Sequence, residues 1–156
     1  MELTQVIRNS VEDSVLCWLA TSSIDNTPNV SPKEIFKCYG SDKIIVANIA
    51  SPKTVSNIKV NPGVCLSCID ILVQKGYQLK GKARIVDNTD SAFMQMEALL
   101  SEMTGGKFPF STITEITIQS AKPILAPRYI LYPETTVAEQ IISAKKTYGL
   151  SYSELM

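Results

Sequence analysis

Histidine is absent from this chain of 156 residues. Its absence excludes a histidine general base, the Ser-His-Asp and Cys-His nucleophilic sites and the HExxH zinc site. The glycine-rich nucleotide motifs GxGxxG and GxxxxGK(S/T) are missing as well. Any chemistry is therefore expected to be carried by something other than the side chains.

The chain also lacks an excess of charge of either sign and a long apolar run. Lysine and arginine together number 15, as do aspartate and glutamate, so no basic field favours nucleic acid. No apolar stretch approaches the roughly 20 residues that a bilayer-spanning helix needs. Residues 1–14 have the pattern of an amphipathic helix and not of a signal peptide. We expect a cytoplasmic protein with one domain over residues 1–156.

Four cysteines are present, and two of them form a CxxC motif, which is often a redox or zinc signal. Cys65 and Cys68 lie in GVCLSCID, which reads as a strand. A spacing of three along a strand places the two thiols on opposite faces. We therefore expect this pair, together with Cys17 and Cys38, to pack as small apolar side chains.

Runs of β-forming residues separated by turn residues make up most of the chain. Strands are predicted at 15–21, 29–39, 44–49, 64–70, 76–86 and 113–119, with a further extended segment, broken by prolines, at 123–132. Helices are predicted near the N-terminus, at 52–60, at 91–103, and at 136–147 after a capping box. Strands with singly inserted helices favour a β-barrel or meander flanked by helices.

The segment ANIASPKTVSNIKVNP, residues 47–62, ends a strand and opens a short helix. Ser51 suits the N-cap, and Pro52 suits the first helical position, where its missing N–H costs nothing. Lys53 is unexpected, because a cation near a helix N-terminus opposes the macrodipole by about 0.3–1 kcal/mol. An anion held between this lysine and the free backbone N–H groups of Lys53 and Thr54 would remove the conflict.

The tripeptide Ser-Pro-Lys occurs twice, as Ser31-Pro32-Lys33 and as Ser51-Pro52-Lys53. The first copy lies on a predicted strand, and the second lies on the turn after the following strand. Adjacent strands of a meander could bring Lys33 and Lys53 to one phosphate. On these residues alone, helix capping and phosphate binding both stay open.

The order of these elements resembles a known family. The segments that carry the resemblance are VLCWLATSSIDNTPNVSPK, KIIVANIASPKTVSNIKVNPGVCLSCID and GYQLKGKARIV. An apolar strand followed by S-x-K, a short helix with an asparagine, an NP dipeptide and a further strand resembles the FMN-binding split-barrel family related to pyridoxamine 5′-phosphate oxidase. The resemblance implies a mainly β fold: an FMN-binding split β-barrel of six or seven mostly antiparallel strands with flanking helices. It also implies a homodimer with FMN at the subunit interface.

The resemblance assigns FMN-binding roles to two segments. It implies that the FMN phosphate is bound by Ser51, Lys53 and Thr54, and that Asn57 supports the helix turn. The strand that lines the ribityl chain and the phosphate corresponds to Val30, Ser31, Pro32 and Lys33. The strand end beside the flavin ring corresponds to Asn48, Ile49 and Ala50.

Two further pairs of residues are weaker candidates. Phe108 and Phe110, on a glycine-containing loop, would complete the site from the second subunit or else serve as ordinary loop anchors. Arg128 and Tyr129 would border a substrate. Their roles stay open at the level of the sequence.

The chain departs from the oxidases in its substrate-binding residues. It lacks their C-terminal segment with an arginine and a histidine, and Gly76 stands where they place a glutamine near the flavin. We therefore expect an FMN-dependent oxidoreductase of unknown substrate, for example a small quinone-like electrophile reduced by a nicotinamide donor, rather than a pyridoxamine phosphate oxidase. The alternatives are a non-catalytic flavin carrier or redox sensor, and a barrel that binds a deazaflavin or haem. The missing histidine speaks against haem.

Overall fold

The computed structural model describes residues 1–150. Within them the elements are α1 (Gln5–Asp13), β1 (Cys17–Ser22), β2 (Pro28–Lys33), β3 (Phe36–Tyr39), β4 (Lys43–Ala47), α2 (Pro52–Val60), β5 (Gly63–Asp70), β6 (Lys75–Asp87), α3 (Phe93–Thr104), β7 (Thr112–Leu125), α4 (Pro127–Leu131) and α5 (Val137–Tyr148). The strands form one sheet in the order β2-β1-β5-β6-β7-β4-β3, and every neighbouring pair is antiparallel. The predicted mainly β fold with flanking helices is confirmed.

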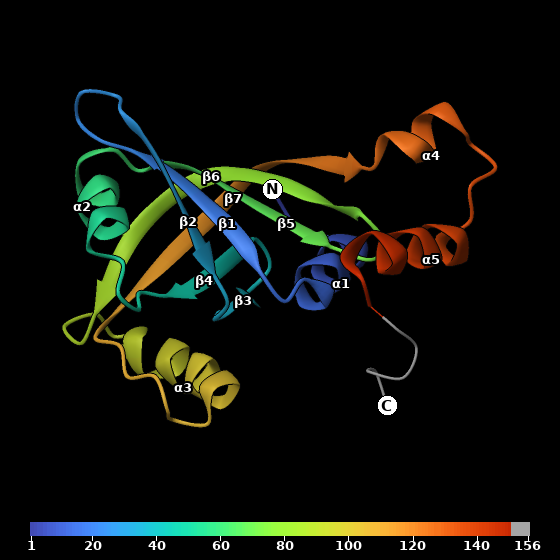
Figure 1. Ribbon diagram of the computed structural model, residues 1–156. Coiled ribbons are helices and arrows are strands. Elements are labelled where there is room, and N and C mark those ends of the chain that lie inside the picture. Colours follow the sequence, from blue (N-terminus) through green and yellow to red (C-terminus); the bar gives the residue numbers. More distant parts are fainter. Residues whose placement is uncertain (151–156) are drawn as a thin grey trace.

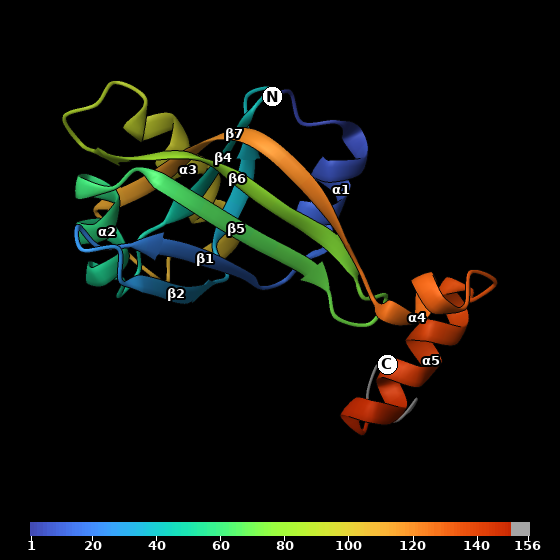
Figure 2. The same ribbon diagram turned by 90° about the horizontal axis from the view of Figure 1, so that it is seen from above.

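Strands β6 and β7 are the long central pair around which the sheet curves (Figures 1 and 2). Their register shifts at a β-bulge between Lys80 and Gly81. A Cβ at Gly81 would lie 2.1 Å from the carbonyl oxygen of Thr117, so only glycine allows the two backbones to approach this closely. The bulge bends the strand and lets the sheet wrap into a barrel.

Two clusters of buried apolar side chains hold the barrel together. The larger fills the barrel beneath α1 and includes Leu19, Leu66 and Leu79. The smaller joins α3 to β4 and β7 and includes Met96 and Leu100. Helices α1, α2 and α3 each cover a separate part of the sheet. The N-terminal end of α2 lies beside strand β2, and these two segments form the site described below.

The structure confirms the expectation for the CxxC motif. Cys65 and Cys68 lie on β5, with Cys68 buried and Cys65 half-buried on the opposite face. All four cysteines are free thiols, and burial raises the pKa of Cys17 and of Cys68 above the ordinary value. The motif is therefore a packing feature of the barrel wall.

The predicted extended segment at 123–132 is partly wrong. Strand β7 continues to Leu125, and Pro127 then opens the short helix α4. Proline suits a first helical position because its ring fixes φ. Pro123 is tolerated in β7 because β4 pairs with β7 only from Ile113 to Thr117, so the rest of β7 is an edge on that side.

We call residues 126–150 the C-terminal arm, because they extend away from the barrel at the far end of β5, β6 and β7 (Figure 2). The hydroxyl of Tyr129 donates to the carbonyl of Val73 at 2.8 Å, and the Lys75 ammonium lies 4.4 Å from the centre of the Tyr129 ring. The predicted capping box of Thr136 and Glu139 opens α5. Within residues 1–150, every helix is too short or too polar to cross a membrane.

Candidate functional site

The turn between β4 and α2 adopts an unusual backbone conformation. Ala50 has φ of 50°, in the left-handed region that residues other than glycine rarely occupy. The N–H of Ile49 donates to the carbonyl of Ala47 at 3.2 Å, which tightens the turn further. This conformation costs of order 1–3 kcal/mol, and such strain is concentrated at functional sites. It turns the chain sharply from the strand into the helix.

Ser51 occupies the predicted N-cap position of α2, but its side chain does not cap the helix. Its hydroxyl donates to the carbonyl of Ile49 at 3.0 Å and accepts a hydrogen bond from the Lys33 ammonium. The capping function expected from the sequence is therefore wrong, because the hydroxyl is turned toward Lys33. Within residues 1–150, the backbone N–H groups of Lys53 and Thr54 have no hydrogen-bond partner.

Lys33 is the most unusual charged residue of this region. Its side chain is 5% exposed, and burial lowers the pKa of its ammonium group. None of the ion pairs formed within residues 1–150 includes it. A buried ammonium group normally has a carboxylate partner, because its desolvation is costly. In the part of the chain that the structure describes, the Ser51 hydroxyl is the one hydrogen-bond partner of the Lys33 ammonium, so the site carries an uncompensated positive charge.

The two Ser-Pro-Lys tripeptides lie against each other. Besides the contact from Lys33 to Ser51, the hydroxyl of Ser31 lies 3.0 Å from the hydroxyl of Thr54, which is buried in the first turn of α2. Alternation along β2 turns Ser31 and Lys33 to the side of α2. Lys53 is exposed beside them. The site thus combines a buried cation, an exposed cation and unpaired N–H donors at a helix start, which is the chemistry that holds an anion.

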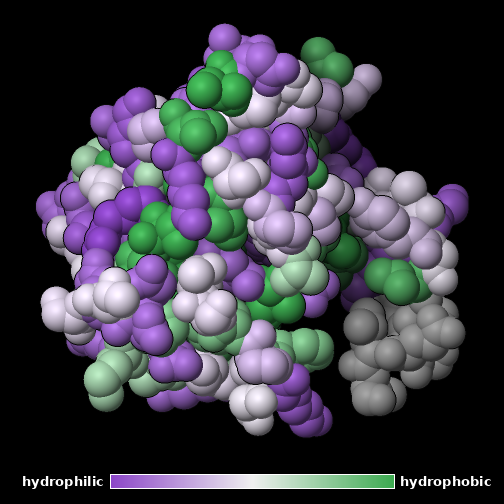
Figure 3. Space-filling view, turned by 90° about the vertical axis from the view of Figure 1, so that its left-hand side faces the viewer, coloured by the Kyte–Doolittle hydropathy of each residue, from purple (hydrophilic) through white to green (hydrophobic). Residues whose placement is uncertain are grey.

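A hollow of about 210 Å³ opens next to Lys33. Its lining combines residues of β2, of the β2–β3 connection, of the end of β4 and of the loop after α3: Pro32, Lys33, Glu34, Ile35, Ala47, Ile49 and Phe108. The space-filling view toward the α2 and α3 end of the molecule shows apolar surface in a recess ringed by polar side chains (Figure 3). An apolar hollow beside a cationic end suits a flat ring that carries a negatively charged group.

The other predicted residues lie outside this hollow. Asn48 and Ala50 line a second hollow of about 440 Å³, which also includes Ser51 and Lys59. The Asn48 amide donates to Thr112 and accepts from Thr114, so it fastens the end of β4 to β7. The turn from Ile49 to Ser51 separates the two hollows.

Three predicted residues have neighbours that point to structural roles. Asn57 is buried and donates from its amide to the hydroxyl of Thr21 at 3.0 Å, which fixes α2 to β1. Phe110 packs against the smaller apolar cluster, as a loop anchor would. Val30 is 56% exposed on the outer face of β2, away from Lys33.

Sequence reasoning missed several parts of the site. Glu34, Ile35 and Ala47 line the hollow beside Lys33 but belong to no motif, and only their position next to predicted residues could have indicated them. No sequence signal predicts the left-handed turn at Ala50, because glycine or asparagine would be the expected residue in that conformation. Arg128 and Tyr129 lie in the C-terminal arm and line neither hollow.

The chain has recognisable relatives. Residues 3–130 match the family model described as pyridoxamine 5′-phosphate oxidase. An uncharacterized protein of Methanocaldococcus jannaschii is 33% identical over 88 residues, which cover 53% of this chain and 56% of that protein. This chain therefore matches little more than half of the relative's length.

Solved structures share the fold at low identity. An FMN-binding protein from Syntrophomonas wolfei superposes with a TM-score of 0.67 at 18% identity, over 80% of this chain and 87% of that one. The heme storage protein HutZ of Vibrio cholerae superposes with a TM-score of 0.63 at 18% identity, over 80% and 95%. Resemblance at this identity supports the fold and leaves the ligand to be argued from the residues.

Proposed function

Because the chain belongs to the pyridoxamine 5′-phosphate oxidase family, we propose that it binds FMN and acts as an FMN-dependent oxidoreductase on a small molecule. The observation that carries the proposal is the buried ammonium of Lys33, which has a hydroxyl partner but no counter-ion within residues 1–150. A phosphate group would supply the missing negative charge.

The residues present fit an FMN phosphate. Lys33 would contribute a buried charge, and the N–H groups of Lys53 and Thr54 would contribute directed donors at a helix start. The exposed ammonium of Lys53 would neutralise the second negative charge of the phosphate. The hollow lined by Ile35, Ala47 and Ile49 would exclude water beside it.

Bound FMN would supply the hydride or electron chemistry, which needs no general base from the protein. This agrees with a chain that contains no histidine. The protein would hold the phosphate, present an apolar wall to the ring and exclude water. Among the described residues, Glu34 is the one carboxylate that lines the hollow, and it forms no ion pair with Lys33.

We further propose that the active form is a homodimer in which the second subunit completes the FMN site. The single-chain hollow has a volume of about 210 Å³. Pockets that bury most of a drug-sized ligand measure about 300–1,000 Å³. The enclosure that the single chain lacks would come from a second copy.

The test is a spectrum of the purified, undialysed protein, followed by mass spectrometry of the ligand released by heat. FMN in near-stoichiometric amount, and turnover with NADH or NADPH, would support the full proposal. FMN without turnover would instead support a flavin carrier or redox sensor. A colourless protein that also fails to bind added FMN would overturn the assignment, as would a deazaflavin or haem among the released ligands.

A further inference from the structure

The C-terminal arm exposes an unusual number of large apolar side chains. The exposed fractions are 66% for Ile130, 70% for Leu131, 58% for Tyr132, 57% for Ile142 and 52% for Tyr148. Single exposed apolar residues are ordinary, but three in succession at the end of α4 and two more on α5 indicate an interaction surface. The arm therefore carries a surface that one subunit alone leaves in water.

The arm is held away from its own barrel. At the start of the arm, the Tyr129 hydroxyl donates to the carbonyl of Val73, the Tyr129 ring lies under Lys75, and the N–H of Ala126 donates to the carbonyl of Gln74 at 3.0 Å. Within residues 1–150, neither α4 nor α5 makes an extensive backbone contact with a strand or another helix, although Gln140 and Ala144 of α5 are buried. Figure 2 shows the arm extending from the far end of β5, β6 and β7.

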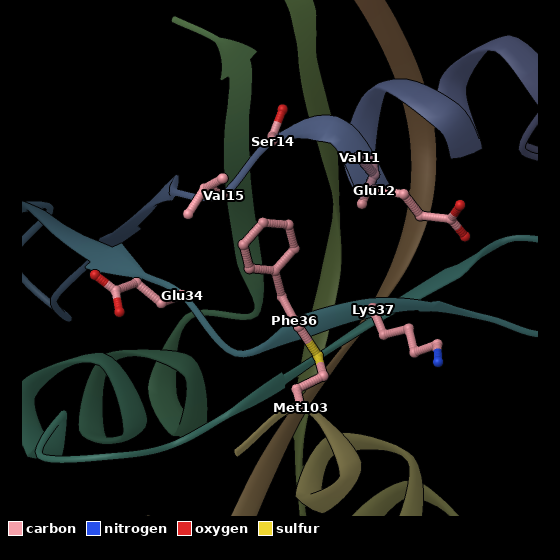
Figure 4. A pocket seen from close by; sticks show the side chains of 8 residues that line it. All are labelled: Val11, Glu12, Ser14, Val15, Glu34, Phe36, Lys37 and Met103. Carbon is pink, nitrogen blue, oxygen red and sulfur yellow. The ribbon is translucent and has the colours of Figure 1, made fainter. Parts of the chain in front are cut away.

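An apolar groove of about 460 Å³ lies on the barrel between the end of α1 and β3. The ring of Phe36 forms its floor, with Val15 on one side and Met103 on the other (Figure 4). Val15 is 84% exposed and Met103 is 45% exposed, so the walls of the groove are open to solvent. Grooves of this kind accept the apolar face of a helix in many complexes.

The charges of the groove and of the arm are complementary. The rim of the groove carries Glu12, Glu34 and Lys37, which sum to one net negative charge. On α5, Ala138, Ile142 and Lys146 recur at spacings of four and share one helix face. Lys146 is exposed one turn beyond Ile142, while the carboxylate of Glu139 is engaged in the capping box. The arm thus presents an aliphatic side chain followed by a cation.

We propose that the C-terminal arm of each subunit docks in the groove of a second copy of this chain. Ile142 would enter the groove over the partner's Phe36, and Lys146 would lie beside the partner's Glu12 and Glu34. In a reciprocal exchange, the contact between arm and groove forms twice in each dimer and buries the exposed arm and the open groove of both subunits. This favours a second copy of the chain over an unrelated protein. The proposal rests on protein surfaces alone and does not depend on FMN.

The exchange would also bring the partner close to the cofactor site. Glu34 lines both the groove and the hollow beside Lys33. An arm docked in the groove would therefore stand next to that hollow. This gives the second subunit a specific segment with which to enclose the site.

The test is carbodiimide cross-linking of the full-length protein, which joins a lysine to a carboxylate that it contacts. The dimer and monomer bands are separated, and the joined peptides of each are identified by mass spectrometry. The proposal expects Lys146 joined to Glu12 or Glu34 in the dimer band. These peptides in the monomer band alone would show an arm folded on its own groove and would overturn the proposal. Their absence from both bands would overturn it as well.

Two exposed substitutions test the contact, and a third serves as a matched control. Ile142→Arg in the arm and Val15→Arg in the groove should each lower the yield of this cross-link by about tenfold, since a charge replaces a central apolar contact. Val6→Arg changes an apolar side chain of α1 that is 66% exposed and does not line the groove, so the yield should stay at the wild-type level. Melting curves establish that all three variants fold. Equal yields in all three would contradict the proposed docking.

Discussion

The same tripeptide, Ser-Pro-Lys, stands in two environments in this protein. In β2 its lysine is 5% exposed and contacts a serine hydroxyl, whereas at the start of α2 its lysine lies in solvent. The serines differ as well, because Ser31 pairs with Thr54 while Ser51 holds Lys33. The same local sequence therefore gives a buried ammonium group in one place and an exposed one in the other, because the tertiary structure around the two copies differs.

The difference in burial predicts different roles for the two lysines in phosphate binding. A buried ammonium interacts strongly with an anion because water screens it little, and an exposed ammonium interacts weakly. The first lysine should therefore fix the phosphate and determine affinity. The second should contribute charge that salt can screen.

The largest effect is expected from Lys33→Ala. If FMN binds as proposed, its affinity should fall by about a hundredfold, because a hydrogen bond to a charged group is worth roughly 1.5–3 kcal/mol and this one is buried. Fluorescence titration with FMN measures the change. Lys122→Ala removes the same charge from an exposed position outside both hollows and should bind as the wild type does. A Lys33→Ala protein with unchanged affinity would remove the basis of the proposed phosphate site.

A smaller effect is expected from Lys53→Ala. Its ammonium is exposed, so FMN affinity should fall by about tenfold at low salt. The loss should shrink as salt is added, whereas the loss for Lys33→Ala should change little. Titrations at two salt concentrations separate the lysines. If both variants respond to salt equally, the difference in burial has no functional consequence.

Most of the fold could be predicted from the sequence. Alternation and turn residues locate most strands to within a few residues, and the capping box at Thr136 fixes the start of α5. The predicted run at 29–39 is instead two strands, β2 and β3, at opposite ends of the sheet order, and the predicted strand at 113–119 is only the first part of β7. The helix α4 was missed because prolines at 123 and 127 suggested a broken extended segment. Proline is compatible both with an unpaired strand edge and with a first helical turn, so local sequence could not distinguish the two.

The sequence indicated some residues of the candidate site but not the contacts between them. The repeated tripeptide pointed to Lys33, Ser51 and Lys53, yet nothing in the sequence says that Lys33 is buried and Lys53 exposed. Burial depends on α2 lying against β2, which is a long-range consequence of strand order. The positive φ of Ala50 depends on the same packing. Local signals could not supply either fact.

Burial of Lys33 also predicts a stability effect in the protein without ligand. Because burial lowers the pKa of this ammonium, the unfolded chain binds its proton more tightly than the folded chain does. Stability should therefore rise as pH increases from the lowered folded pKa toward the ordinary value of the free amine. Lys33→Met should stabilise the ligand-free protein by about 1 kcal/mol at neutral pH and abolish this rise.

Urea unfolding of the ligand-free protein between neutral and alkaline pH measures both quantities. Lys53→Met serves as the control, because it removes an ammonium group that is exposed in the folded protein. If the Lys33→Met protein is less stable than the wild type at neutral pH, the ammonium is compensated by interactions other than the Ser51 hydroxyl.

The smallest effect on FMN affinity is expected from Ser51→Ala, which tests the role of this serine. The hydroxyl accepts from the buried ammonium of Lys33 and makes no capping hydrogen bond, so FMN affinity should fall by about threefold. The ligand-free protein should lose about 1–3 kcal/mol of stability, because a buried charged donor loses its hydrogen-bond partner. Thr136→Ala is the matched comparison, because Thr136 accepts from the N–H of Glu139 and does cap its helix. That substitution should cost about 1 kcal/mol of stability, the usual cost of losing an N-cap, with FMN affinity unchanged. Thermal melts and FMN titrations of both variants measure the pair. If Ser51→Ala binds FMN as tightly as Thr136→Ala does, the Ser51 hydroxyl does not hold Lys33 for the phosphate, and the two Ser-Pro-Lys segments do not form one site.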